Sequence, residues 1–109
     1  MEEEFIILNN LIINDLQLDE SEALTYISDT PDLNFFHQKL TQLIRHLLDH
    51  DMYRLLNAMY RLDVSEAKFS KAMHSPDRDE AARSIASLVL EREMQKVKTR
   101  LHYKKHRKF

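Results

Sequence analysis

The sequence predicts an all-α protein, a small helical bundle of about five to six helices with a long, protruding C-terminal helix. The first observation is that none of the 109 residues is glycine, although tight β-hairpin turns depend on glycine. The second is that apolar residues recur at steps of three and four along most of the chain. The third is that only Pro31 and Pro76 can interrupt a helix, and each follows a Thr or Ser that can cap the next helix.

The first predicted helix spans residues 3–17 and has a wide apolar face, which indicates burial. Its apolar residues are Phe5, Leu8, Ile12 and Leu16 along one ridge, with Ile6 and Ile13 beside it. The alternative is a hairpin, in which the runs FIIL and LII form two short strands around Asn9 and Asn10. We favour the helix because an isolated hairpin is marginally stable and the sequence offers no third strand.

Capping signals place the next two helices. Asp19 and Glu22 have the spacing of a capping box, and the short helix that they open ends before Pro31. The apolar residues of this short helix are Ala23, Leu24 and Ile27. Thr30 is the predicted cap of a third helix, which extends to about residue 49. The core-facing residues predicted for this third helix are Leu33, Phe36, Leu40, Leu43, Ile44, Leu47 and Leu48.

Two shorter helices follow. A fourth helix begins at about residue 51, and its apolar residues are Met52, Leu55, Leu56, Met59 and Tyr60. A fifth begins near Asp63 or Ser65, because both residue types suit an N-cap. Its apolar side consists of Val64, Ala67, Phe69 and Met73.

The last helix begins in the segment SPDRDEAARS, with Ser75, Asp77 or Asp79 as its cap, and runs to about residue 104. Its first apolar stripe consists of Ala82, Ile85, Ala86 and Val89. Its second stripe consists of Leu90, Met94, Val97 and Leu101. The second stripe is rotated from the first by roughly a quarter turn around the helix. We therefore expect the first half to pack into the bundle and the second half to dock on a partner or on a second copy.

The length and composition predict one soluble domain. Residues 1–95 form a single helical domain in this interpretation, and residues 96–109 form a basic C-terminal extension. The acidic start and the interrupted apolar run do not resemble a secretory signal, and no stretch approaches the ~20 apolar residues of a membrane span. Without cysteine there is no disulfide framework. We therefore expect a cytoplasmic protein that does not bind membranes.

Two stretches, LLNAMYRLDVSEAKF (residues 55–69) and SLVLEREMQKVKTR (residues 87–100), resemble short uncharacterised all-helical proteins of bacteria. The resemblance covers about residues 55–100. It implies a helical fold and brings no activity and no functional residue with it.

Histidine pairs are the only candidates for a metal site. His46 and His50 are one helical turn apart and can share a metal, but no third ligand accompanies them, since Asp49 points away. His102 and His106 repeat this spacing among cations that repel a divalent ion. The sequence therefore predicts no metal and no cofactor.

The motifs of enzymes are also missing from this sequence. Phosphate-binding loops and the nucleophile elbow of hydrolases need glycine. The carboxylates Glu91 and Glu93 are two residues apart, so they point to different sides of their helix. We expect a non-enzymatic protein with no catalytic residue and no small-molecule substrate.

Charge is divided unevenly along the chain. Residues 1–66 hold 13 acidic and four basic residues, a balance of −9, whereas residues 67–109 hold five acidic and 12 basic residues, a balance of +7. The near-neutral total of −2 therefore conceals a polar molecule. After Glu93 there is no further acidic residue. The cations that follow it are Lys96, Lys98, Arg100, Lys104, Lys105, Arg107 and Lys108.

Three interpretations of this basic end compete. It is a solvated helix end whose cations suit the C-terminal pole of the helix dipole. Alternatively it contacts an acidic surface, either the N-terminal half of its own chain or that of a second copy. In the third interpretation it binds nucleic acid, with Tyr103 and Phe109 available to stack on bases, although a pI of about 6.3 is unlike that of most such proteins.

The function predicted from the sequence is a protein–protein interaction or self-association module that acts through the C-terminal helix and its basic tail. The alternative is an RNA-, DNA- or ribosome-associated protein that uses the same tail. The predicted contact residues are Met94, Lys96, Val97, Arg100, Leu101, Tyr103, Lys104, Lys105, Arg107 and Lys108.

Overall fold

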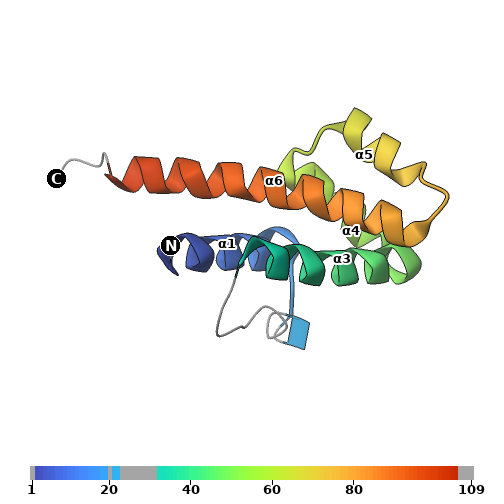
Figure 1. The fold of residues 1–109 in the computed structure, drawn as a ribbon, viewed down its shortest axis with the longest axis horizontal. Coiled ribbons are helices and arrows are strands. Elements are labelled where there is room, and N and C mark those ends of the chain that lie inside the picture. The colour runs from blue at the N-terminus through green and yellow to red at the C-terminus, as the bar shows by residue number, and fades with distance from the viewer. Residues whose placement is uncertain (1, 20, 23–31, 106–109) are drawn as a thin grey trace.

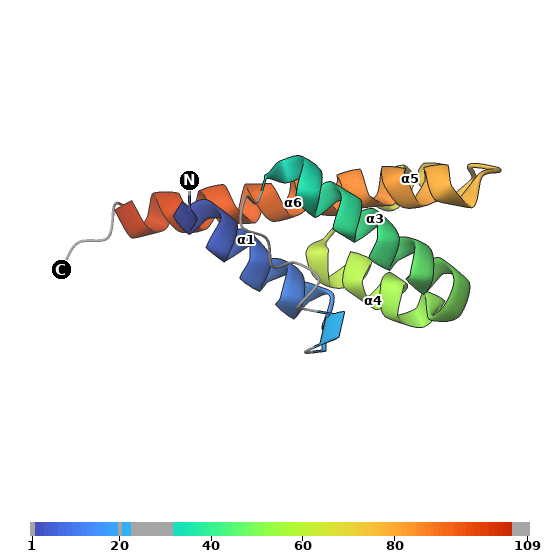
Figure 2. The ribbon, with the colours of Figure 1, turned by 60° about the horizontal axis from the view of Figure 1, so that its bottom comes forward.

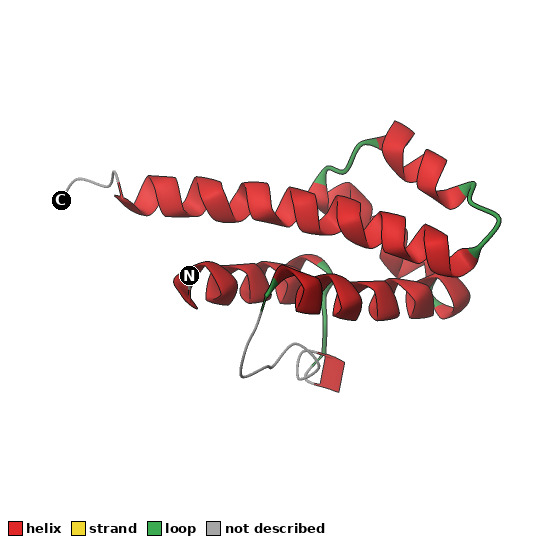
Figure 3. Ribbon diagram, in the orientation of Figure 1, coloured by secondary structure: helices red, strands yellow, loops and turns green. Residues whose placement is uncertain are grey.

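The computed structural model describes residues 2–19, 21–22 and 32–105. These residues contain five helices and no strand (Figure 3). The helices are α1 (Glu2–Asp15), α3 (Leu33–His50), α4 (Met52–Leu62), α5 (Glu66–Met73) and α6 (Arg78–Lys105). The prediction of a small all-α bundle with a long C-terminal helix is confirmed. Within the described ranges, no helix combines the length and apolar character needed to cross a bilayer.

Helix α6 is the spine of the bundle. The other four helices pack against it, with α3 along its N-terminal half and α1 along its C-terminal half (Figure 1). Helix α4 lies beside α3, as the rotated view shows (Figure 2). Helix α5 lies on the other side of α6 from α3 (Figure 1). The core lies where these helices meet on α6, and its fully buried residues include Phe36, Leu40, Ile44 and Ile85. The molecule is elongated, with extents of 51 × 31 × 22 Å.

The N-terminal segment is a helix, so the hairpin alternative is wrong. Leu8, Ile12 and Leu16 are buried as predicted, whereas Ile6 is 61% exposed and lies outside the contact. The helix closes with a Schellman motif, in which the Leu18 N–H donates to the Ile13 carbonyl at 2.9 Å. The motif requires a left-handed residue at the helix end, and here that residue is Gln17, with φ of 51°.

The capping box predicted between Asp19 and Glu22 is confirmed. The Glu22 N–H donates to Asp19 Oδ1 at 2.8 Å, and the Asp19 N–H donates to Glu22 Oε1 at 3.1 Å. The rest of the expected second helix lies outside the described residues, including Ala23, Leu24, Ile27, Thr30 and Pro31.

Helix α3 begins later than predicted. Its N-cap is Asp32 and not Thr30, since Asp32 Oδ1 accepts the Phe35 N–H at 2.7 Å. Leu33, in the first turn, is 44% exposed and does not join the core. Four residues of the predicted ridge are fully buried, namely Phe36, Leu40, Ile44 and Leu47, and Leu43 and Leu48 are half-buried beside them.

The two short helices begin at side-chain caps. Asp51 accepts the Arg54 N–H at the start of α4, and Ser65 accepts the Lys68 N–H at the start of α5. Asp63, the other predicted cap for α5, instead ends α4 in a left-handed conformation with φ of 58°. Helix α4 buries Leu55, Ala58, Met59 and Leu62. Leu56 and Tyr60 are exposed, so the apolar residues expected for this helix do not all lie on its buried side.

Helix α6 begins after Asp77, whose Oδ1 accepts the Asp79 N–H at 2.9 Å. Its first apolar stripe is fully buried as predicted, namely Ala82, Ile85, Ala86 and Val89. Helix α6 is continuous across residues 95 and 96. The expected division of the chain at that point stays a prediction.

Candidate functional site

The C-terminal half of α6 packs against α1, which corrects the expectation that its second apolar stripe is free for a partner. Val97 is fully buried, and Leu90, Met94 and Leu101 are partly buried against the core. The two helices run antiparallel, so the start of α1 lies beside the end of α6 (Figure 1). Three of the predicted contact residues, Met94, Val97 and Leu101, therefore serve the fold itself.

Acidic residues of α1 also take up part of the basic ridge. Lys96 Nζ lies 2.7 Å from Asp15 Oδ2, and Lys104 pairs with Glu3. These two cations therefore contact an acidic surface of their own chain, which is the N-terminal helix α1. Opposite charges from the two ends of the sequence meet because the helices are antiparallel.

A buried carboxyl group sits inside this contact. Glu93 is fully buried, neither of its side-chain oxygens has a hydrogen-bond partner, and Lys96 Nζ is 3.8 Å from Oε1. The pKa of Glu93 is raised to about 8, mainly by burial and also by the neighbouring Asp15, while the charges of Lys96 and Arg100 lower it by less. Glu93 therefore carries its proton at neutral pH, and Lys96 is left to neutralise Asp15.

The solvent side of the same turns keeps its charges. Lys98, Arg100 and Tyr103 are exposed, Tyr103 by 76%. Within the part of the chain that the structure describes, neither Lys98 nor Arg100 forms an ion pair. Lys105 is the last helical residue, and Arg107 and Lys108 lie outside the described residues. The predicted site is thus divided into a buried side that holds α1 and an exposed basic side.

A second ionic group stabilises the opposite end of α1. Arg54 on α4 donates to both carboxylate oxygens of Glu22, at 3.0 and 2.7 Å, and to the carbonyls of Leu16 and Gln17 at 3.2 and 3.0 Å. The hydrogen bond from Arg54 is the main reason that the pKa of Glu22 is lowered. This network ties the capping box and the end of α1 to α4, and its groups are already satisfied by one another.

His46 and His50 of α3 lie next to each other without a third metal ligand among the described residues. The rings of His46 and His50 lie with their centroids 4.8 Å apart. Across the described ranges, no three His, Asp or Glu side chains are grouped closely enough to hold a metal ion.

One serine–histidine pair, which the sequence analysis did not foresee, joins α3 to α6. His37 Nε2 lies 3.0 Å from Ser87 Oγ and 3.1 Å from the Arg83 carbonyl, and Ser87 Oγ also donates to that carbonyl. Nε2 must carry a proton to bond a carbonyl, so it is not free to take one from serine. Among the described residues, no carboxylate hydrogen-bonds to His37 to orient its ring. The pair is a helix-to-helix contact.

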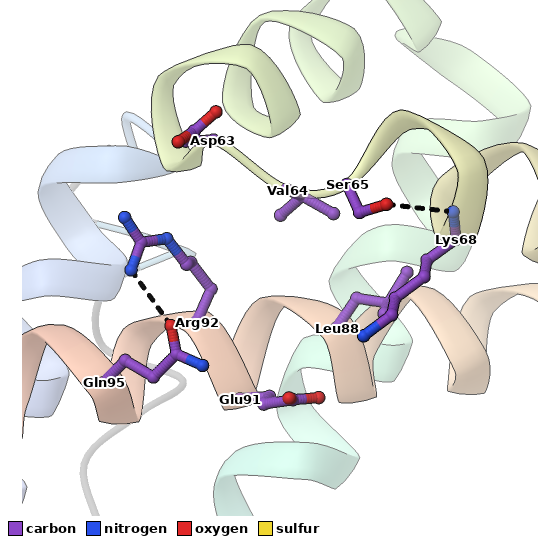
Figure 4. Close-up of a pocket in the computed structure, with 8 residues that line it drawn as sticks. All are labelled: Asp63, Val64, Ser65, Lys68, Leu88, Glu91, Arg92 and Gln95. Carbon is purple, nitrogen blue, oxygen red and sulfur yellow. Dashed lines mark hydrogen bonds between the residues drawn. The ribbon is translucent and has the colours of Figure 1, made fainter.

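A small polar cavity of about 260 Å³ lies between the α4–α5 connection and α6 (Figure 4). Its main polar group, Arg92, donates to the Leu62 carbonyl at 2.9 Å and to Gln95 at 3.0 Å. The Ser65 hydroxyl is occupied as the cap of α5. These hydrogen bonds hold the α4–α5 connection and the start of α5 in place beside α6.

An exposed aromatic surface lies on α4, whose apolar residues the sequence analysis did not divide between a buried and an exposed side. Tyr53, Leu56 and Tyr60 are exposed on its outward side. Their spacing of three and four residues is a helical stripe, and it lies opposite the residues that α4 buries. The sequence alone contains a signal for this exposed surface, because a helical wheel places Tyr53 and Tyr60 on the opposite side of the helix from Leu55 and Met59.

These features define a small all-α bundle held together by its C-terminal helix, with a basic helix end and an aromatic helix face on its surface. No protein-family model, no curated protein and no solved structure matches the chain. The resemblance of residues 55–100 to short helical bacterial proteins therefore stays a prediction.

Proposed function

We propose that this chain is a non-enzymatic protein-interaction module that binds an acidic protein surface through the exposed end of α6. The observation that carries the proposal is the exposure of Lys98, Arg100 and Tyr103 in the last turns of α6. The end of this helix extends past the start of α1 (Figure 2). The acids of α1 engage Lys96 and Lys104 and leave this side uncompensated.

The composition of this surface suits a protein partner. An exposed ion pair contributes only about 0.2–1 kcal/mol, so two cations alone bind weakly. Tyrosine and arginine are enriched among the residues that contribute most of the binding energy at protein interfaces. Tyr103 and Arg100 are about one helical turn apart on α6. The sequence continues with Lys105, Arg107 and Lys108, which add positive charge to the same end.

Nucleic acid is the second candidate, and one observation counts against it. Lys96 and Lys104 must leave Asp15 and Glu3 before they can meet phosphates. The five remaining cations of the chain's end correspond to a log–log salt slope of roughly −4.5 for a duplex.

The test compares two fluorescently labelled probes, a poly-glutamate peptide and an RNA oligonucleotide, by anisotropy at low and physiological salt. The site variant is the double substitution Lys98→Glu/Arg100→Glu. The control is Lys68→Glu/Lys71→Glu on α5, which changes the net charge by the same amount at exposed positions. Truncation at Gln95 is unsuitable because it removes the buried Val97 and the partner of Asp15.

We expect the peptide to bind the parent and the control chain, and the site variant to bind about tenfold more weakly, since two attractions become repulsions. Equal losses in both variants, or no peptide binding at all, overturn the proposal. RNA binding at physiological salt with the steep slope, without peptide binding, supports the second candidate instead.

A further inference from the structure

The outward side of α4 carries aromatic residues that the fold does not use. Tyr53 and Tyr60 are 78% and 89% exposed, and Leu56 between them is 47% exposed. At 100° per residue, the two tyrosines lie within about 20° of each other and almost opposite the buried side of the helix. Tyrosine is usually at least partly buried in a monomer and is enriched at protein interfaces.

A groove runs beside this stripe, between α4 and α5. Its volume is about 500 Å³. Its walls are apolar, and two acids stand among them; the lining residues are Leu56, Met59, Tyr60, Val64, Phe69, Asp63 and Glu66. The groove can hold a tyrosine side chain, whose ring suits the apolar walls and whose hydroxyl can donate to a carboxylate.

We propose that this face is a homodimer interface, in which the α4 helices of two copies pack antiparallel about a two-fold axis. Positions 53 and 60 are equally distant from the midpoint between Leu56 and Asn57. When the two-fold axis passes through this midpoint, antiparallel pairing sets Tyr53 of each copy against the groove beside Tyr60 of the other. The exposed ring and the groove that receives it lie on one surface, which is the self-complementarity that a two-fold interface requires.

The spacing along the helix fits this arrangement. Residues 53 and 60 are two turns apart, or about 10.5 Å along the axis. Two such helices pack at about 8–10 Å between axes. Leu56 then lies next to the two-fold axis, where it meets Leu56 of the second copy.

The area of this face predicts a weak dimer. At about 200 Å² for each tyrosine side chain, Tyr53 and Tyr60 expose about 330 Å² per copy. With Leu56 and the groove walls, two copies bury on the order of 1,000 Å², below the 1,200–2,000 Å² of stable complexes. We therefore expect a dissociation constant in the micromolar range or weaker.

The first experiment is sedimentation equilibrium of the full chain over protein concentrations from micromolar to millimolar. We expect the parent to shift from monomer to dimer, and Tyr53→Glu and Tyr60→Glu to stay monomeric. Tyr103→Glu is the matched control, because Tyr103 is 76% exposed but lies on α6. Circular dichroism checks that each variant keeps the helical content of the parent.

A second experiment fixes the geometry, and the absence of cysteine makes it possible. A bismaleimide linker of about 8 Å, near the distance between packed helix axes, should couple Leu56→Cys to itself. Tyr53→Cys should couple more readily to Tyr60→Cys than to another copy of itself, because antiparallel packing sets these positions opposite each other. Tyr103→Cys is the control for random collision.

A parent chain that stays monomeric at millimolar concentration overturns the proposal. So does a dimer that Tyr103→Glu dissociates and the α4 variants leave intact, since that result assigns self-association to α6. Preferred coupling of Tyr53→Cys to itself contradicts the antiparallel arrangement. None of these outcomes bears on the binding of an acidic partner by Lys98 and Arg100, which the charge-reversal variant tests separately.

Discussion

Glu93 makes the stability of this protein depend on pH in an uncommon direction. Its carboxyl group is fully buried, and its pKa is about 8 in the folded chain against 4.5 for an exposed glutamate. Below pH 4.5 the group is protonated in both the folded and the unfolded chain, so it adds no pH dependence there. Between 4.5 and 8 the unfolded chain loses this proton and the folded chain keeps it, so the free energy of unfolding falls as the pH rises.

The magnitude follows from the difference between these two pKa values. The loss is about 1.4 kcal/mol per pH unit across this window, and it reaches on the order of 5 kcal/mol above pH 8, where it stays constant. Substitution of Glu93 by Gln keeps the shape of the side chain and removes the ionisation. The stability difference between Glu93→Gln and the parent should therefore grow from near zero at pH 4.5 to several kcal/mol above pH 8.

Urea denaturation followed by far-UV circular dichroism, repeated across this pH range, measures the difference. Subtracting the parent from the variant cancels groups with the opposite dependence, such as Glu22, whose pKa is lowered. Glu91→Gln is the control, because Glu91 is exposed on the same helix. A difference between Glu93→Gln and the parent that does not change with pH refutes the burial of an ionisable carboxyl group at this position.

Three further substitutions test the structure of α1 and its contacts. Gln17→Gly should raise the free energy of unfolding by about 1 kcal/mol in a urea titration. The left-handed conformation costs a non-glycine residue about 1–2 kcal/mol, and the greater flexibility of glycine in the unfolded chain offsets part of this gain. A decrease contradicts the assigned helix end. Val97→Ala should lower the free energy of unfolding by about 2 kcal/mol, because it removes two buried methyl groups and leaves a cavity. The control Tyr103→Ala, at an exposed position of the same helix, should change the free energy of unfolding by less than about 0.5 kcal/mol. Equal effects of the two substitutions would mean that α1 does not cover α6. Arg54→Met should lower the free energy of unfolding by about 1–2 kcal/mol at neutral pH, since the pair is only partly buried. The cost should shrink as the pH falls from 4.5 through the lowered pKa of Glu22, where the folded chain protonates this carboxylate. A cost independent of pH would mean that Arg54 does not stabilise the fold through Glu22.

The two surface proposals assign different parts of the molecule to different partners. The exposed end of α6 is basic and depends mainly on charge complementarity with its partner, whereas the α4 face is aromatic and depends on shape complementarity. Because the charge-reversal and tyrosine variants lie on separate helices, each proposal can fail without the other.

Much of the secondary structure could be predicted because its causes are local. The capping box at Asp19 and Glu22 needs only a spacing of three residues, and the absence of glycine needs no spatial information. The cap of α3 was assigned wrongly because Thr30 and Asp32 are both good caps, and local chemistry does not rank them. The spacing of Glu91 and Glu93 correctly put them on different sides of α6, but it did not reveal which side is buried.

The candidate site was predicted less well, for a physical reason. An apolar line on α6 can be covered by the chain's own helix or by another molecule, and the sequence pattern is the same in both cases. The packing of α1 against α6 decides this for Val97, and it also brings Asp15 and Lys96, 81 residues apart, within 2.7 Å. The exposure of Tyr53 and Tyr60 is likewise set by which side of α4 meets the bundle.

By itself, the sequence determined the all-helical class, the approximate limits of the helices and the separation of acidic and basic residues along the chain, since these depend on neighbours within a few positions. Only the tertiary structure decided which helix faces meet, which cations are neutralised and where a carboxyl group is buried. These outcomes depend on contacts between residues far apart in the sequence, and no local pattern records which of several compatible faces pack together.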